Sequence, residues 1–377
     1  MVSAQFRCAN LLNYDLQDFA RFEPLSEIHG TQWHDWPTDP DTPPEDRHDF
    51  HMWLQWVAAV QLTDAQARSK AAGMPLGLYL DLAVGSRRDG AESWCEQAAV
   101  AQGVSIGAQP DHLSPEWQNG NLTAFAPRKL KELRSRPLRA ILAQTIRHAD
   151  IIRIDHVLGL NRSYWIPNDG SPGGYIRQPF ESLIAIIKIE AERFNCAVVG
   201  EDRGLVPDGF RDTMRSHGFY GYSVLQYEKD DQGAFQKTND IPVQVLSYFA
   251  THHTPTLRGY ETRQNIHWCE KLAWIDALAA DALRQERAAE VGAFRRNTDF
   301  QARINGLLAQ SNASLVNVQL DDILVVEDAQ NLPGTIEQHP NWQRKHDRQL
   351  KNLPAHERLR ATAQLMNDAG RHNAGKG

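Results

Sequence analysis

The chain has 377 residues, of which 41% are hydrophobic and 23% are charged, and its formal net charge is −7. This length suits one large α/β domain or two smaller ones, and the hydrophobic content suits a packed core. The acidic balance argues against nucleic acid or an anionic membrane as the main partner. No apolar run approaches the about 20 residues that cross a bilayer, and residues 1–10 lack a signal pattern, so we expect a cytoplasmic protein.

The cysteines and histidines predict neither a disulfide framework nor a metal centre. The four cysteines are far apart and form no CxxC pair, which is typical of reduced thiols; they are Cys8, Cys95, Cys196 and Cys269. The 15 histidines include no metal-ligand spacing such as HExxH, and the adjacent pair His252-His253 is the only candidate. We therefore expect no metal and no cofactor.

Residues 1–74 are expected to form a helical and loop insertion region. Within it, residues 1–50 are rich in Pro, Asp and Trp and predict loops with a short helix, whereas residues 50–72 have helical periodicity that would turn Trp53 and Trp56 toward the core. Residues 86–128 are rich in Gly, Pro and Asn and read as a long loop. A loop of this length in a compact domain is usually functional or an unrecognised element.

Short apolar stretches that alternate with helical patterns make up residues 75–345. The stretches predict buried strands at 75–84, 149–152, 196–199, 222–227, 243–250 and 315–318. The patterns predict helices at 138–148, 182–194 with Ser182 as N-cap, 207–216, 270–295 and 299–310, and a helical tail at 346–377. Such alternation indicates parallel βα units.

Polar residues at the carboxyl ends of these strands favour an α/β fold of the (β/α)8 TIM-barrel type with helical insertions. Residues 75–345 would be its catalytic portion. A doubly wound sheet is the alternative, but no Gly-rich phosphate-binding fingerprint follows any strand.

Two neighbouring strand ends carry carboxylates. Arg153-Ile154-Asp155-His156 closes one strand and Gly200-Glu201-Asp202 closes the next. A retaining glycosidase needs such a pair, one as nucleophile and one as acid/base. Residues i and i+2 of a strand share a face, so Arg153 would lie beside Asp155 and favour its ionised form. A surface ion pair and an ordinary strand-end carboxylate remain the alternatives, and Asp202 points to the other face as a structural residue.

Read together, these motifs resemble the 4-α-glucanotransferase family, also called amylomaltases or disproportionating enzymes, which are relatives of the α-amylases. The resemblance extends from about residue 75 to 345. Its motifs occur in the family's order: 77–85, Pro110-Asp111 with Ser114-Pro115, 153–156, Trp165-Ile166-Pro167, 200–202, Thr251-His252 with 255–259, and 331–335 with Pro340-Asn341-Trp342.

The resemblance implies a double displacement on α-1,4-glucans such as maltooligosaccharides. Asp155 would attack the anomeric carbon, and Glu201 would protonate the departing sugar and then activate the 4-hydroxyl of a second glucan instead of water. Substrate contacts would come from Arg153, His156, His252, Asp81, Trp165 and Asp111.

The sequence departs from the family in three places. His253 stands where the family carries an aspartate that supports the oxocarbenium-like transition state, and losing one such group typically costs on the order of 10²–10³ in rate. Trp117 and Gly120 stand as though exchanged in a substrate-binding loop. The sequence also contains no segment that corresponds to the first two barrel strands of the family, and their absence would leave sheet edges unpaired.

These departures predict a transferase with impaired activity. Two other functions fit the same residues. One is an α-amylase-like hydrolase, since hydrolysis and transfer use the same groups, and the other is an inactive glucan-binding paralogue or a fragment.

Overall fold

The computed structural model describes residues 14–108, 118–231, 233–295 and 299–371. The chain divides after Phe219 into an amino-terminal and a carboxy-terminal unit, each compact by itself.

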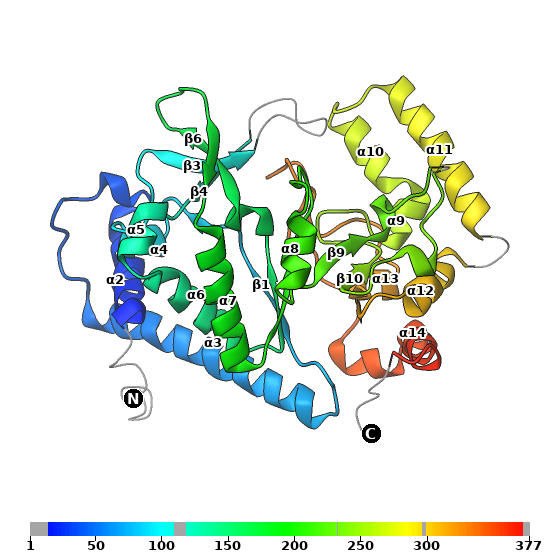
Figure 1. Ribbon diagram of the computed structural model, residues 1–377, viewed down its shortest axis with the longest axis horizontal. Coiled ribbons are helices and arrows are strands. Elements are labelled where there is room, and N and C mark those ends of the chain that lie inside the picture. Colours follow the sequence, from blue (N-terminus) through cyan, green and yellow to red (C-terminus); the bar gives the residue numbers. More distant parts are fainter. Residues whose placement is uncertain (1–13, 109–117, 232, 296–298, 372–377) are drawn as a thin grey trace. The chain divides into compact units, whose positions relative to one another are not determined.

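The amino-terminal unit contains a three-stranded parallel sheet in the order β1-β5-β8, with β1 at Tyr79–Leu82, β5 at Ile151–Ile154 and β8 at Ala197–Gly200. All four residues of β5 are buried, because it is the central strand. The helices α6 (Arg136–Ile146) and α7 (Phe180–Phe194) share one hydrophobic core with these strands. Figure 1 labels β1 of this sheet and the helices α6 and α7. The predicted strands and helices are confirmed here.

Two details of this layer differ from the prediction. Ser182 is not an N-cap, since α7 begins at Phe180 after Pro179, and no side chain caps it. β1 is not buried: Tyr79 is 37% exposed, and among the described strands β1 pairs only with β5. An apolar run cannot by itself distinguish an edge strand from a central one.

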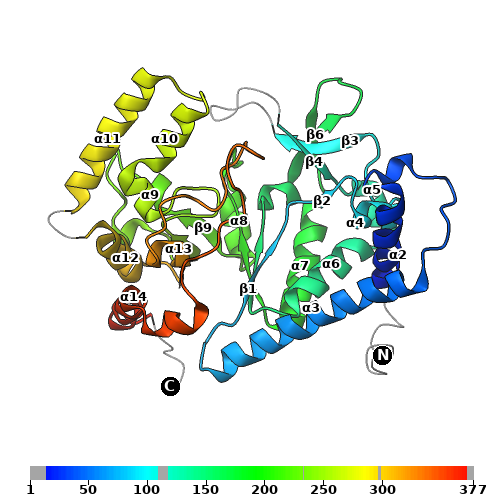
Figure 2. The ribbon, with the colours of Figure 1, turned by 180° about the vertical axis from the view of Figure 1, so that it is seen from behind.

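A five-stranded antiparallel sheet in the order β2-β4-β3-β6-β7 occupies much of the segment expected to be a long loop (Figure 2). Its strands are β2 (Ser86–Arg87), β3 (Val104–Ala108), β4 (Gln118–Thr123), β6 (Arg162–Pro167) and β7 (Gly174–Arg177), and the short helices α4 (Ala91–Cys95) and α5 (Pro127–Glu132) lie between them. The loop prediction was wrong because strands this short, separated by Gly and Asn, give too few alternations to detect.

Helices at the start of the amino-terminal unit are longer than expected. They are α2 (Tyr14–His29), the 3₁₀ turn η1 (Trp33–Asp35) and α3 (Glu45–Ala71), with α2 packed against α3 and α4. The helix expected at residues 50–72 is confirmed, but its core face is only partly as predicted. Trp56 is half-buried and packs against Ala20 and Met52, as expected. Trp53 is 39% exposed, and Met52 is the buried residue of α3. The unit also contains η2 (Val157–Leu160) and ends with α8 (Phe210–Ser216).

The carboxy-terminal unit contains a second three-stranded parallel sheet, in the order β11-β10-β9. Its strands are β9 (Gly221–Val224), β10 (Val245–Tyr248) and β11 (Leu315–Val316). The helices are α9 (Leu257–Thr262), α10 (Gln264–Lys271), α11 (Ala277–Arg295), α12 (Phe300–Gln310), α13 (Leu320–Ile323) and α14 (Glu357–Asp368), with 3₁₀ turns η3 (Leu225–Tyr227), η4 (Thr238–Asp240) and η5 (Leu350–Ala355). Its hydrophobic core combines aliphatic side chains with an aromatic cluster of Phe235, Phe249, Tyr260 and Phe300.

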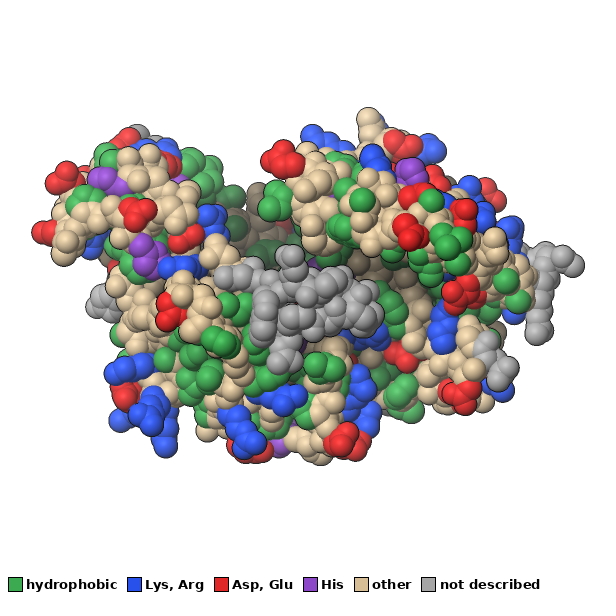
Figure 3. Space-filling model, turned by 90° about the horizontal axis from the view of Figure 1, so that it is seen from above, with side chains coloured by type: hydrophobic (Ala, Val, Ile, Leu, Met, Phe, Trp, Pro, Cys, Tyr) green, Lys and Arg blue, Asp and Glu red, His purple; other side chains and the backbone are tan. Residues whose placement is uncertain are grey.

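All the predicted strands therefore occur in parallel sheets. Closure of these sheets into a barrel, and the absence of the first two strands of a barrel, stay predictions. The surface seen in Figure 3 carries acidic and basic side chains interspersed. Across the described part of the chain, no helix combines the length and apolarity needed to span a membrane.

Candidate active site

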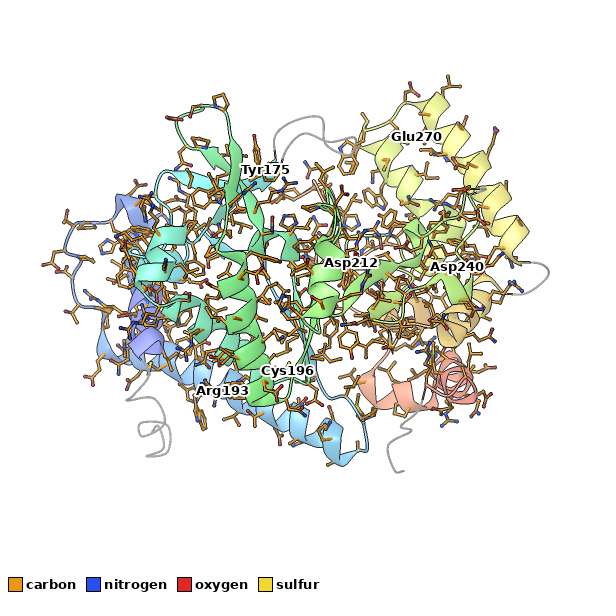
Figure 4. The ribbon with its side chains drawn as sticks, viewed as in Figure 1. Tyr175, Arg193, Cys196, Asp212, Asp240 and Glu270 are labelled. Atoms are coloured by element: carbon orange, nitrogen blue, oxygen red, sulfur yellow. The ribbon has the colours of Figure 1, made fainter. Side chains whose placement is uncertain are left out.

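Asp155 and Glu201 follow two adjacent parallel strands. Ile154 of β5 pairs with Gly200 of β8, and the N–H of Glu201 donates to the carbonyl of Ile154 at 3.0 Å, so the next residue of each strand emerges at the same sheet edge. Gly200 permits this approach, because a Cβ there would lie 2.9 Å from Cγ1 of Val157. Cys196, labelled in Figure 4, precedes β8 at the opposite end of the sheet.

The guanidinium of Arg153 holds two carboxylates. Its Nη1 donates to both oxygens of Asp81 at 2.8 Å, and its Nη2 lies 2.5 Å from Oδ1 of Asp155. Asp81 stands directly opposite Arg153 in the β1–β5 register. Arg153 is buried, whereas Asp155 and Asp81 are more exposed. The buried guanidinium therefore holds both solvent-accessible carboxylates in place through charge-assisted contacts.

Glu201 is held by main-chain groups. Its Oε2 accepts from the N–H of His156 at 3.1 Å, and its Oε1 accepts from the N–H of Arg203 at 3.0 Å. Burial raises the pKa of Glu201, and the charge of Asp155 raises it further, against the opposing effects of both N–H groups and of Arg153. The net direction favours the protonated carboxyl, as a general acid requires.

His156 occupies the left-handed region of backbone conformation, with φ of 47°. This turn directs its main-chain N–H to Glu201. Burial lowers the pKa of its imidazole, so the neutral ring is favoured. His156 thus has a backbone role beside the substrate contact that was predicted for it.

A cavity of about 220 Å³ borders Asp155 and His156 and is lined mainly by apolar residues, with Glu92 of α4 also among its lining residues. Oε1 of Glu92 is buried without a hydrogen-bond partner among the described residues. Burial raises the pKa of Glu92 to about 7. Sequence reasoning missed Glu92, whose only signal was a lone carboxylate between Ala91 and a Ser-Trp pair.

The remaining predicted residues of this unit lie in different environments. Asp202 is buried and its Oδ2 accepts from Nε of Arg211 at 2.8 Å, which agrees with a structural residue. Trp165 lies on β6, where its Nε1 donates to Oγ of Ser163 at 2.8 Å. Asp111 and Trp117 lie outside the described residues.

His252 and His253 follow β10 in the carboxy-terminal unit. Their ring centroids lie 4.0 Å apart, and Nδ1 of His253 lies 3.2 Å from Nδ2 of Asn331. The ring of Trp342 lies 5.5 Å from that of His252. Asn331 and Trp342 belong to the motifs of the sequence, but no role was predicted for them. Over the described ranges of both units, no group of three or more His, Cys, Asp or Glu side chains could hold a metal ion.

Comparisons with known proteins identify the family. The family model of 4-alpha-glucanotransferase matches residues 4–350. The chain is 35% identical over 360 residues to a 4-alpha-glucanotransferase of Mycobacterium tuberculosis (strain ATCC 25618 / H37Rv), covering 87% of this chain and 49% of that protein. It is 32% identical over 337 residues to the Haemophilus influenzae 4-alpha-glucanotransferase, covering 82% and 48% respectively.

Two solved amylomaltase structures have a similar fold. The fold matches the amylomaltase of Corynebacterium glutamicum with a TM-score of 0.86 and 27% identity, covering 97% of this chain and 57% of that one. It also matches the amylomaltase of Streptococcus agalactiae, solved in complex with acarbose, with a TM-score of 0.79 and 16% identity, covering 98% and 75%.

The chain spans about half the length of the curated relatives it matches. The family match covers most of the chain, and the fold follows that of amylomaltases. The chain therefore belongs to the 4-alpha-glucanotransferase family.

Proposed function

We propose that this chain carries the machinery of a retaining 4-α-glucanotransferase, which moves α-1,4-glucan segments between maltooligosaccharides, and that His253 impairs it. Residues 75–345 would form the catalytic portion, between an insertion region at 1–74 and a tail at 346–377, and the protein would act in the cytoplasm without a cofactor.

The observation that carries the proposal is the contrast between two neighbouring carboxyl groups. Asp155 is held by the Arg153 guanidinium at 2.5 Å, which orients its carboxylate as a nucleophile, whereas burial raises the pKa of Glu201 and favours a proton donor. These different environments suit nucleophilic attack by Asp155 and proton transfer by Glu201.

In the proposed reaction, an oxygen of Asp155 bonds to the anomeric carbon while the glycosidic C–O bond breaks. Glu201 gives its proton to the departing 4-oxygen. Glu201 then accepts the proton of a second glucan's 4-hydroxyl as that oxygen displaces Asp155. Arg153 would hold Asp155 throughout, and Asp81, His156, His252, Trp165 and Asp111 would contact sugar.

The decisive experiment measures maltotriose disproportionation by the unsubstituted chain, by Asp155→Asn and by His253→Asp. Transfer yields glucose together with longer glucans, and we expect Asp155→Asn to abolish it. His253→Asp should raise the rate on the order of 10²-fold, because it restores a negative charge beside the developing cation. Equal rates for the unsubstituted chain and His253→Asp would contradict the proposed impairment.

The same assay separates the alternatives. Simple shortening of glucans without longer products would identify an α-amylase-like hydrolase. His253 also favours a second candidate, a glucan-binding protein without turnover, because a neutral imidazole supplies no negative charge. Binding of maltoheptaose with no product from any variant would identify that function.

A further inference from the structure

The surface beside the histidine pair contains an aromatic ring that the proposed reaction leaves without a role. Trp342 is 64% exposed, although burial of an indole is normally favourable. Its ring centroid lies 5.5 Å from that of His252, at an angle of 49° between the ring planes. Its indole nitrogen makes no hydrogen bond to any described residue.

The segment 330–342 folds back on itself and fixes the position of this ring. The side-chain amide of Asn341 donates to the carbonyl and to the hydroxyl of Thr335 at 3.0 and 2.9 Å, and its oxygen accepts from the N–H of Leu332 at 2.9 Å. The N–H of Trp342 donates to the carbonyl of Gln330 at 2.9 Å. These hydrogen bonds hold the backbone of Trp342 in place while its side chain stays exposed.

The backbone at Trp342 is also unusual. Its φ is 57°, in the left-handed region that bulky side chains rarely adopt. Such conformations persist where the surrounding contacts hold them, and they cluster at ligand sites. Here the closed segment holds the conformation, and its result is a large flat ring beside His252.

The neighbouring groups have the chemistry of a carbohydrate site. A glucose ring has an apolar C–H face and a rim of hydroxyls. The indole face can pack against the former, while the imidazoles and the amide of Asn331 can hydrogen-bond the latter. Nδ2 of Asn331 lies 3.2 Å from Nδ1 of His253, so the amide and both rings belong to one surface.

We propose that Trp342 is the stacking platform for a glucose unit of the α-1,4-glucan, and that His252, His253 and Asn331 hydrogen-bond its hydroxyls. This inference rests on the proposed function and adds a residue that determines glucan affinity. The closed segment 330–342 positions that residue.

A matched control lies in the same unit. Trp274 is 48% exposed, and its ring lies 3.5 Å from the position that a Cβ at Gly334 would take, so it packs beside the same segment. No ring contact joins it to a histidine among the described residues. Trp274→Phe therefore reports what the loss of an exposed indole does when no sugar stacks on it.

The test titrates the full chain with maltoheptaose by calorimetry, for the unsubstituted protein, Trp342→Ala, Trp342→Phe and Trp274→Phe. We expect Trp342→Ala to raise Kd about tenfold or more, Trp342→Phe to raise it less, and Trp274→Phe to leave it within twofold. Thermal unfolding of each variant checks that the fold is retained. If Trp342→Ala unfolds, Trp342→Phe and Trp342→Leu replace it in the comparison, and leucine must weaken binding more than phenylalanine.

Two results would overturn the inference and are distinguishable from one another. Binding by Trp342→Ala within twofold of the unsubstituted chain would remove the role of Trp342 while leaving the proposed function intact. Failure of the unsubstituted chain to bind maltoheptaose would reject both proposals.

Discussion

Arg153 and Asp81 form a forked contact, in which one guanidinium nitrogen lies 2.8 Å from both carboxylate oxygens. The second guanidinium nitrogen is thereby turned to Asp155. One buried cation thus links the β1 and β5 strands and orients the proposed nucleophile. This arrangement depends on the planar shape of arginine, which lysine does not have.

Arg153→Lys should retain the fold but lower kcat for maltotriose disproportionation on the order of 10²-fold, because a point charge cannot reach Asp81 and Asp155 together. Arg211→Lys is the control, since Arg211 contacts Asp202 instead. A similar loss in both variants would mean that the effect is one of general stability, and kcat should then be compared with the unfolding midpoint.

The charge of Asp155 should be visible in the titration of Glu201. Asp155→Asn removes a charge that raises the pKa of Glu201, so that pKa should fall. The measurement is ¹³C NMR of labelled glutamate carboxyls between pH 3 and 9. Asp202→Asn is the control and should leave the Glu201 titration nearly unchanged, because the charge of Asp202 is already paired with Arg211. An unchanged pKa in Asp155→Asn would show that the two carboxyls are not coupled.

Gly200 lies directly against the side chain of Val157. Gly200→Ala should destabilise the protein by about 1–3 kcal/mol, because the new methyl group would lie 2.9 Å from the side chain of Val157. Gly159→Ala is the matched control, since its Cβ would meet only His156, at 3.7 Å. Urea unfolding measures both. Equal free energies of unfolding for the two variants would contradict the close approach.

Asp322 should make folding stability depend on pH. It is 3% exposed, and burial raises its pKa to about 7 from the ordinary 3.8, although the N–H of Leu257 donates to it at 2.7 Å. The folded state therefore keeps a proton that the unfolded chain releases, so this contribution to stability is full below about pH 4 and is lost as pH rises toward about 7.

Asp322→Asn removes this dependence. It should be close to the unsubstituted chain in stability near pH 4 and more stable by roughly a few kcal/mol at pH 8, with the buried hydrogen bond from Leu257 retained. Urea unfolding at both pH values provides the measurement. Asp347→Asn, a change at an exposed carboxylate of the same unit, is the control. A stability difference that does not grow with pH would contradict the assignment.

The positions of the parallel strands could be predicted from the sequence, but their exposure to solvent could not. Apolar stretches located β5 and β8 and their terminal carboxylates, because buried strands are short, continuous and followed by polar residues. The exposure of β1 could not be predicted, since an edge position depends on which partner strands exist. The antiparallel sheet was missed because its strands are short, such as β2 with two residues and β7 with four, and give too few alternations to detect.

The sequence indicated the residue types of the candidate site but not the groups that hold them in place. Asp155 and Glu201 followed from strand ends and from the family resemblance. The N–H of His156 that holds Glu201 arises from a left-handed turn at a non-glycine residue, and no side-chain pattern signals it. Glu92 lines the cavity from α4, which is far from Asp155 in the chain, so only the folded structure places the two carboxyls at one cavity.

Glu201 is held by main-chain N–H groups and not by any described side chain, which leaves the neighbouring side chains open to substitution. Peptide N–H groups are supplied by every residue except proline, so the side chains at positions 156 and 203 can vary while the carboxyl stays in place. Libraries with all residue types at these two positions could therefore introduce new side chains near the proposed sugar site. The Glu201 carboxyl should keep its position, provided that position 156 keeps its left-handed turn. The backbone would then preserve the proposed reaction centre, and neighbouring side chains could change to alter specificity.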